Sequence, residues 1–297
     1  MKIQRVGVIG CGLMGHGIAQ IAAQGGCDVV VVETEQAFLD KGLGRIEKSV
    51  KKLAQKAVEK GKKSEAEAEA MASATLGRLK GSLDKQDLAD CDLVIEAIVE
   101  NLDVKKALFA ELGGICKAET VFASNTSSFP IGEMAAASGR PSRFVGLHFF
   151  NPVQLMRLVE VVRTDETDEE VFAAARAFGE ACGKTPVSCK DTPGFVVNRL
   201  LVPYMTQALL MLERGDATRE DIDAAMQLGC GYPMGPLTLT DYVGLDTTLF
   251  ILQGWNERYP DEPSFQVPAI LERMVAEGKL GRKSGEGFYK WDGDKKA

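Results

Sequence analysis

Residues 3–33, IQRVGVIGCGLMGHGIAQIAAQGGCDVVVVE, are the most informative segment for the fold class. Residues 3–9 are rich in β-branched side chains and predict a strand, and residues 13–24 predict a helix. Residues 28–33 are almost wholly apolar and predict a second, buried strand. A strand, a helix and another strand within about 30 residues are typical of a βαβ unit, so we expect parallel strands joined by a helix.

Further apolar runs predict more strands of the same sheet, at Leu93–Ile98, Val121–Ser124 and Val145–Phe149. Such runs fit a parallel sheet with helices on both faces, a doubly wound α/β domain of the Rossmann type. Residues 41–75 are rich in Lys and then in Glu and Ala, which predicts a polar helical hairpin inserted into this domain. The charged hairpin is either a solvated outer face or part of a ligand site.

The pattern changes at VSCKDTPGF, residues 187–195, where Pro and Gly indicate a linker. Beyond it the spacing of apolar residues predicts long amphipathic helices, one of them beginning at Thr218 as N-cap with Asp221 three residues on. We therefore expect a Rossmann-like domain over residues 1–188 and an all-α C-terminal domain over residues 189–297.

The composition excludes several classes of protein. The 297 residues are 45% hydrophobic and 26% charged, which is typical of a globular chain of about two domains. The formal net charge of −7 disfavours binding to nucleic acid or to an anionic membrane. The seven cysteines are scattered and form no C-x-x-C pair, which argues against a disulfide framework or a zinc site. Without a signal-like or membrane-spanning segment, we expect a cytoplasmic protein with no metal.

The sequence GCGLMG matches the G-x-G-x-x-G pattern directly after a strand and at the start of a helix. Gly10 permits a tight turn, Gly12 permits close approach of the backbone to a pyrophosphate, and Gly15 permits close packing of helix on strand. Leu13 and Met14 lie at the start of the helix, whose N-terminus attracts an anion. The pattern therefore predicts a dinucleotide site.

Glu33 ends the second strand, about 20 residues beyond the glycines. A carboxylate at this place accepts hydrogen bonds from the ribose hydroxyls of NAD and repels the 2′-phosphate of NADP. Glu33 therefore favours NAD, unless it is an ordinary carboxylate at a strand end.

Only two histidines are present, so few side chains titrate near neutral pH. His16 lies beside the expected pyrophosphate and is interpreted as structural. His148 ends the run FVGLH, at the carboxyl edge of the sheet where such folds bind ligands. Glu160 lies in a return segment that can bring its carboxylate to the imidazole, as a general base requires, and Asn151 is close in sequence.

Two other parts of the sequence carry polar side chains that are candidates for contact with a ligand. Residues 124–128, SNTSS, end another strand and offer hydroxyl and amide groups, including Ser127, at the same edge of the sheet. A polar turn is the alternative interpretation. Asn198 is an amide in an apolar run of the first C-terminal helix and needs hydrogen-bond partners if it is buried.

Seven segments together resemble the 3-hydroxyacyl-CoA dehydrogenase family, most of all its single-function 3-hydroxybutyryl-CoA dehydrogenases. The resemblance covers nearly the whole chain, and its segments are GCGLMGHGIA, VIEAIVEN, ASNTSS, GLHFFNPV, CKDTPGFVVNRLLVPY, GYPMGPLTLTDYVGLD and GRKSGEGFY.

The resemblance implies a role for each of the polar residues named above. His148 would be the general acid and base at the substrate 3-hydroxyl, and Glu160 would orient it. Ser127 and Asn198 would hold the reacting oxygen and the thioester carbonyl. Asn151 would lie beside the nicotinamide.

The resemblance also implies contacts with the cofactor and with coenzyme A. Glu100, Lys105 and Lys283 match positions that contact NAD in the family. Ser49 and Lys56 of the hairpin would contact the CoA moiety of an acyl-CoA substrate. The family pairs its subunits through the α-helical domain, so a homodimer is expected.

The function that the sequence predicts is NAD-dependent oxidation of a short (S)-3-hydroxyacyl-CoA to the 3-ketoacyl-CoA, with no metal because the cofactor itself is the electrophile. One alternative is a dehydrogenase of a free 3-hydroxy acid or a sugar acid. The other is a non-catalytic relative that binds a dinucleotide.

Overall fold

The computed structural model describes residues 1–297, which divide into two compact units, Met1–Phe195 and Val196–Ala297. The boundary lies after the one that the sequence predicts, residues 188 and 189, because strand β8 (Thr185–Lys190) spans that point. The backbone of β8 is hydrogen-bonded to β7 (Leu158–Arg163), so the segment stays with the first unit.

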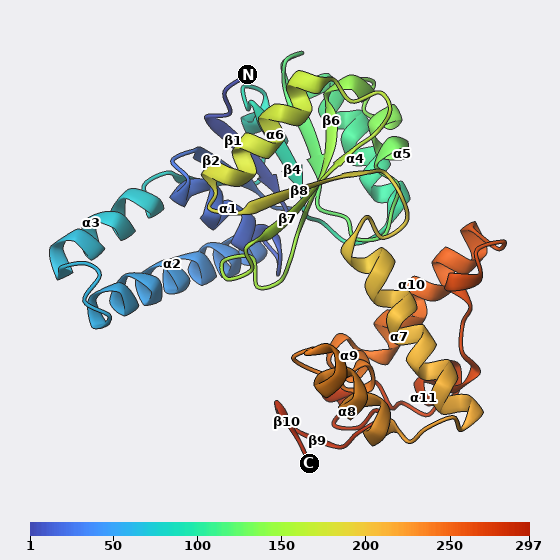
Figure 1. Ribbon diagram of the computed structural model, residues 1–297. Helices are drawn as coiled ribbons and strands as arrows, with labels where there is room; N and C mark the ends of the chain where they lie inside the picture. The colour runs from blue at the N-terminus through green and yellow to red at the C-terminus, as the bar shows by residue number, and fades with distance from the viewer. The chain divides into compact units, whose positions relative to one another are not determined.

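The first unit is built on one eight-stranded sheet (Figure 1) with the strand order β3-β2-β1-β4-β5-β6-β7-β8. All neighbouring strands are parallel except β6 and β7, which are antiparallel. The order reverses direction between β1 and β4, where doubly wound sheets bind ligands at the carboxyl ends of the strands. The other strands are β1 (Arg5–Ile9), β2 (Asp28–Val32), β3 (Leu79–Ser82), β4 (Leu93–Glu96), β5 (Val121–Ser124) and β6 (Phe144–Phe149).

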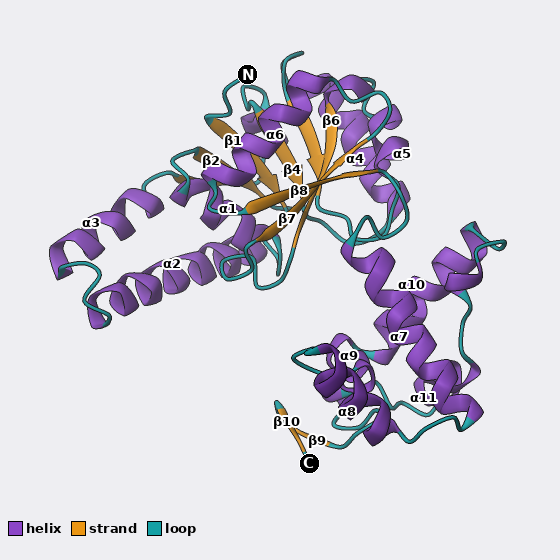
Figure 2. Ribbon diagram, viewed as in Figure 1, coloured by secondary structure: helices purple, strands orange, loops and turns teal.

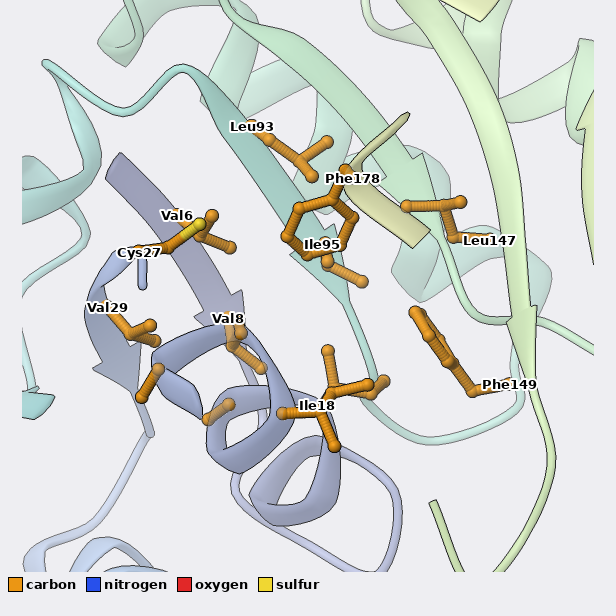
Figure 3. Close-up of a cluster of buried hydrophobic side chains, with 14 of the residues drawn as sticks. Val6, Val8, Ile18, Cys27, Val29, Leu93, Ile95, Leu147, Phe149 and Phe178 are labelled. Carbon is orange, nitrogen blue, oxygen red and sulfur yellow. The ribbon is translucent and has the colours of Figure 1, made fainter. Parts of the chain in front are cut away.

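Helices cover both faces of this sheet because alternate strand residues point to opposite faces. On one face, Val6, Ile95 and Leu147 pack against Ile18 of α1 and Phe178 of α6 (Figure 3). On the other face, the strands pack against α4 and α5. The bounds are α1 (Gly15–Gln24), α4 (Leu102–Ile115), α5 (Ile131–Ala137) and α6 (Glu169–Ala181), with short 3-10 turns at Lys85–Leu88 and Pro141–Arg143.

The predicted helical hairpin is confirmed as α2 (Gln36–Glu59) and α3 (Glu65–Leu76), which lie side by side and extend away from the sheet (Figure 1). Ser64 begins α3 with a capping box, in which its hydroxyl accepts from the Glu67 amide and the Glu67 carboxylate accepts from the Ser64 amide. Few side chains of the hairpin are buried, which agrees with its polar sequence.

The second unit is helical apart from one short hairpin (Figure 2). Thr218 caps α8 as predicted, since its side chain accepts from the Asp221 amide. Leu209, Leu237 and Leu252 are members of the buried core that joins its helices. The elements are α7 (Val197–Arg214), α8 (Arg219–Cys230), α9 (Pro236–Val243), α10 (Leu245–Arg258), α11 (Ala269–Ala276), β9 (Trp291–Asp292) and β10 (Lys295–Lys296), with 3-10 turns at Pro263–Phe265 and Arg282–Ser284.

The strand predictions succeed where the strand is buried on both faces. The strand at Val121–Ser124 is confirmed with the predicted bounds, and the other four predicted strands differ only at their ends. Three strands of the eight-stranded sheet are not predicted from the sequence. β3 and β8 have mostly exposed or half-buried side chains at the two edges of the sheet. β7 is buried, but the sequence indicates only a return segment there. None of the helices combines the length and the apolar character needed to cross a membrane.

Candidate active site

The glycine-rich turn joins β1 to α1 and is shaped by backbone crowding. Gly10 has a φ of +90°, and a Cβ there would lie 2.6 Å from the carbonyl oxygen of Ala97. A Cβ on Gly15 would lie 1.8 Å from the carbonyl oxygen of Gly10. Gly12 is exposed, and a Cβ on it would meet no atom within 4 Å. Two glycines are thus required by the turn itself, and the third keeps the backbone open to a ligand.

The N-terminus of α1 carries no side-chain cap, so this end of the helix is available to an anionic ligand. Leu13 is 61% exposed and Met14 is half-buried beside it. The imidazole Nδ1 of His16 lies 2.6 Å from the carbonyl oxygen of Gly12, which fits a structural role for this histidine.

Glu33 follows β2 and reaches back to the glycine turn. Its Oε1 accepts a hydrogen bond of 2.6 Å from the Cys11 amide, and its Oε2 accepts one of 3.1 Å from the Thr34 amide. These two bonds fix the carboxylate next to the turn, where the ribose of a dinucleotide is expected. Burial raises the pKa of the Cys11 thiol to about 12, and the nearby Glu33 carboxylate adds to this. Cys11 is therefore an uncharged packing group at neutral pH.

His148 and Glu160 form a buried pair that the sheet itself aligns. They lie directly opposite each other in the antiparallel β6–β7 ladder, so both side chains point to the same face. The imidazole Nδ1 lies 2.6 Å from Glu160 Oε2, and the two residues are 4% and 0% exposed. A carboxylate only accepts hydrogen bonds, so Nδ1 carries the hydrogen and Nε2 is left as the acceptor.

Ser127 completes this line of groups. Its Oγ lies 2.9 Å from His148 Nε2. The rings of Phe150 and Phe195 lie 4.5 Å and 5.6 Å from the imidazole ring, centroid to centroid, and give it apolar neighbours. A hydroxyl, an imidazole and a carboxylate in sequence are suited to moving a proton at Nε2.

A second set of charged groups lies beside Ser127. Glu100 Oε1 accepts from Thr126 Oγ1 at 2.5 Å and from the Ser127 amide at 3.2 Å. Its Oε2 lies 3.0 Å from Lys105 Nζ, which also binds Glu96 Oε1 at 2.6 Å. Lys105 is only 1% exposed, so its ammonium group is enclosed by the two carboxylates. The family resemblance implies contacts of both residues with NAD, and Glu100 is the more exposed of the two, with 35% of its side chain accessible.

The remaining predicted residues are carried by other elements of the chain. Asn151 is exposed in the loop after β6. Ser49 is half-buried and Lys56 exposed, both on α2 of the hairpin. In the second unit, Asn198 is half-buried in the first turn of α7, and Lys283 makes an ion pair of 2.5 Å with Asp246.

Glu96 and Thr126 are the site residues that the sequence analysis leaves without a role. Both lie inside quoted motifs, VIEAIVEN and ASNTSS. The available signal was a carboxylate inside the apolar run LVIEAI, since a buried charge needs a partner. The sequence does not show which lysine supplies that partner.

Comparisons with known proteins agree over both units. Residues 5–192 match the family described as "3-hydroxyacyl-CoA dehydrogenase, NAD binding domain", and residues 194–291 match "3-hydroxyacyl-CoA dehydrogenase, C-terminal domain". The mitochondrial hydroxyacyl-coenzyme A dehydrogenase of Rattus norvegicus is 52% identical over 290 residues, which cover 97% of this chain and 91% of the relative.

Two bacterial relatives are similar over their whole length. The "Probable 3-hydroxybutyryl-CoA dehydrogenase" of Deinococcus radiodurans is 51% identical, with 97% of this chain and 100% of the relative covered. The crystal structure of (S)-3-hydroxybutyryl-CoA dehydrogenase from Ralstonia eutropha superposes with a TM-score of 0.91 at 40% identity, covering 98% of this chain and all of that one.

The Rossmann-type sheet, the glycine turn and the paired histidine define an NAD-dependent dehydrogenase with a helical second domain. The chain belongs to the 3-hydroxyacyl-CoA dehydrogenase family. The predictions of fold class, family and cofactor are thereby confirmed.

The residues of the first unit fit NAD. The exposed backbone at Gly12 and the uncapped start of α1 suit a pyrophosphate, and the fixed Glu33 carboxylate suits the hydroxyls of an unphosphorylated ribose. When bound, NAD supplies the electrophilic carbon that accepts a hydride.

Proposed function

We propose that this protein oxidises short (S)-3-hydroxyacyl-CoA thioesters, 3-hydroxybutyryl-CoA above all, reversibly to the 3-ketoacyl-CoA. The observation that carries the proposal is the line Glu160–His148–Ser127, with distances of 2.6 Å and 2.9 Å. The names of the bacterial relatives support the chain length of the substrate.

In oxidation, His148 Nε2 takes the proton of the substrate 3-hydroxyl while the C3–H bond breaks and its electron pair leaves as hydride. The carbonyl double bond forms between C3 and its oxygen, and the imidazolium is stabilised by the Glu160 carboxylate. In reduction, Nε2 returns the proton to the same oxygen. The contact of Ser127 Oγ with Nε2 supports a role of Ser127 in holding that oxygen against the imidazole.

The other roles carried over from the family belong to this proposal. Glu100, Lys105, Asn151 and Lys283 are proposed to lie around the cofactor. Asn198 is proposed to hold the thioester carbonyl. Ser49 and Lys56 are proposed to contact the CoA moiety, and their place on a half-exposed face of α2 supports this.

We also propose a cytoplasmic homodimer that works in short-chain acyl-CoA metabolism, such as that of fatty acids or butanoate. Large apolar side chains exposed on the helical unit support pairing through it, among them Leu200 at 69%, Leu228 at 86% and Phe250 at 58%. All seven cysteines are free, which supports a reducing compartment. Sedimentation of the purified protein tests the dimer.

The decisive assay follows NADH absorbance with acetoacetyl-CoA, with free acetoacetate and with NADPH in parallel. Turnover with the CoA ester and NADH is expected. Turnover with free acetoacetate instead would show that the substrate is a free 3-oxo acid. NADH binding without turnover of either compound would favour a non-catalytic role.

The variant His148→Asn tests the assignment of the base. It should bind NADH normally and lose about 10²- to 10⁴-fold in kcat, the range typical of general acid–base catalysis. Near-normal kcat in this variant would contradict the assignment.

A further inference from the structure

Glu96, at the carboxyl end of β4, is a charged side chain with no exposed surface. It points to the face of the sheet that α4 covers, as do Ser124 of β5 and His148 of β6 on the following strands. A buried carboxylate costs stability unless it is paired and hydrogen-bonded, so its contacts indicate what it is retained for.

Both oxygens of Glu96 are used. Oε1 accepts from Lys105 Nζ at 2.6 Å and from the Ile98 amide at 2.8 Å. Oε2 accepts from Ser124 Oγ at 2.5 Å. Two of these donors, Lys105 and Ser124, are also connected by further hydrogen bonds to the loop that follows β5.

The first connection runs through the lysine. Lys105 Nζ also binds Glu100 Oε2 at 3.0 Å, and Glu100 Oε1 accepts from Thr126 Oγ1 and from the Ser127 amide. One ammonium group thus faces two carboxylates, and the outer carboxylate holds the backbone of Ser127.

The second connection runs through the serine. Ser124 Oγ, which donates to Glu96, accepts from the Thr126 amide at 3.2 Å. Thr126 is therefore held at its amide by one connection and at its hydroxyl by the other. Thr126 Oγ1 in turn accepts from the amides of Ser128 and Phe129. Both connections start at Glu96, and together they hold the conformation of the loop from residue 124 to residue 129.

We propose that Glu96 is a positioning residue for hydride transfer, which holds the loop that sets Ser127 Oγ 2.9 Å from His148 Nε2. This inference rests on the proposed function. An apolar residue at this position would leave Lys105 with one carboxylate and Ser124 without its acceptor. A glutamine would keep the shape but present one acceptor oxygen in place of two.

Strand β4 offers a matched control at its other end. Asp92 directly precedes β4, and its carboxylate also pairs with a lysine, since its Oδ1 lies 2.7 Å from Lys117 Nζ. Its Oδ2 accepts from the amides of Gln4 and Arg5, at the edge opposite the site. Asp92→Asn therefore removes a carboxylate–lysine ion pair, more exposed than that of Glu96, next to the same strand without touching the loop.

The experiment measures kcat and both KM values for acetoacetyl-CoA and NADH in Glu96→Gln, Ser124→Ala and Asp92→Asn. We expect Glu96→Gln to lower kcat by about tenfold or more, because small displacements of reacting groups cost up to about 10²-fold. Ser124→Ala should lower kcat less, and Asp92→Asn should leave it unchanged. The KM for NADH should change less than kcat, because Glu100 keeps its ion pair with Lys105 when Glu96 is replaced.

A double-mutant cycle separates positioning from general support of the fold. If Glu96 acts through Ser127, then adding Glu96→Gln to Ser127→Ala should cost less than threefold further in kcat. A cost that multiplies in full would overturn the proposal. So would a fall in kcat of the same size in Asp92→Asn.

Two other outcomes are also decisive. If Glu96→Gln does not fold, Ser124→Ala takes its place in the double-mutant cycle with Ser127→Ala. If the losses in kcat of Ser124→Ala and Ser127→Ala then multiply in full, Glu96 does not position Ser127. If the wild-type enzyme does not turn over acetoacetyl-CoA, the proposed function fails and takes this inference with it. If the wild type turns over acetoacetyl-CoA and Glu96→Gln keeps full activity, the positioning role of Glu96 is refuted while the proposed function stands.

Discussion

Replacing Glu160 by glutamine tests the pairing on which the chemistry depends. The Glu160 carboxylate is fully buried and lies 2.6 Å from His148 Nδ1. The glutamine has nearly the same shape, so the β6–β7 ladder should be kept. What changes is the charge that faces the imidazole, and the amide can also present its NH₂ group to Nδ1.

The expected loss follows from the strength of this bond. A hydrogen bond to a charged group contributes about 1.5 to 3 kcal/mol, and each 1.36 kcal/mol corresponds to tenfold in rate. Because the imidazole becomes positive only as the proton moves, this stabilisation is lost mainly in the transition state. We therefore expect Glu160→Gln to lower kcat by about tenfold to 150-fold, with little change in KM for NADH.

The assay is steady-state reduction of acetoacetyl-CoA, with thermal unfolding measured on the same sample. Glu169→Gln is the control, because Glu169 makes an ion pair of 2.8 Å with Arg163 on the surface of the same unit and is 76% exposed. It should behave as wild type. If Glu160→Gln keeps full kcat, or loses affinity for NADH instead, then the carboxylate does not orient the base.

Three further predictions concern the glycine turn, the preference for NADH over NADPH, and Asp92 at the start of β4. Gly15→Ala places a Cβ 1.8 Å from the carbonyl oxygen of Gly10, so it should raise the Kd for NADH at least tenfold, and unchanged binding in a fluorescence titration would contradict the geometry. Glu33→Ala should narrow the preference for NADH over NADPH, measured as the ratio of kcat/KM values, and a constant ratio would show that Glu33 does not contact the ribose. Burial raises the pKa of Asp92, but the bond from Lys117 and the amide donors outweigh it and leave that pKa below its usual 3.8. A depressed carboxyl pKa gives stability that is present above the unfolded-state pKa and lost as the pH falls through the folded-state value, so Asp92→Asn should be less stable than wild type at pH 7. In urea titrations the difference should shrink below about pH 3.8, and a difference that does not depend on pH would refute this.

Local sequence was sufficient to predict the glycine turn and the strand end that carries Glu33. Gly10, Gly15 and Glu33 act within one βαβ unit, where the turn and the strand end follow from neighbouring residues. The strand at Val121–Ser124 was predictable for a related reason, because a run buried on both faces is apolar throughout.

The pairing of His148 with Glu160 was only partly predictable. The sequence indicates that a return segment can bring the carboxylate back, but it does not give the alignment of the two strands. A shift of one residue would turn Glu160 to the opposite face of the sheet. The antiparallel ladder between β6 and β7, which sets His148 opposite Glu160, is decided by the packing of the whole sheet.

The fold class, the family and the cofactor follow from the sequence alone, because these depend on short motifs and on periodic burial. Only the tertiary structure showed that Lys105 is enclosed by Glu96 and Glu100. Lysine is seldom buried, so nothing local distinguishes this one from the many solvated lysines of the chain. Its environment is created by α4 packing onto the strand end that carries Glu96, and burial of this kind depends on segments brought together by folding.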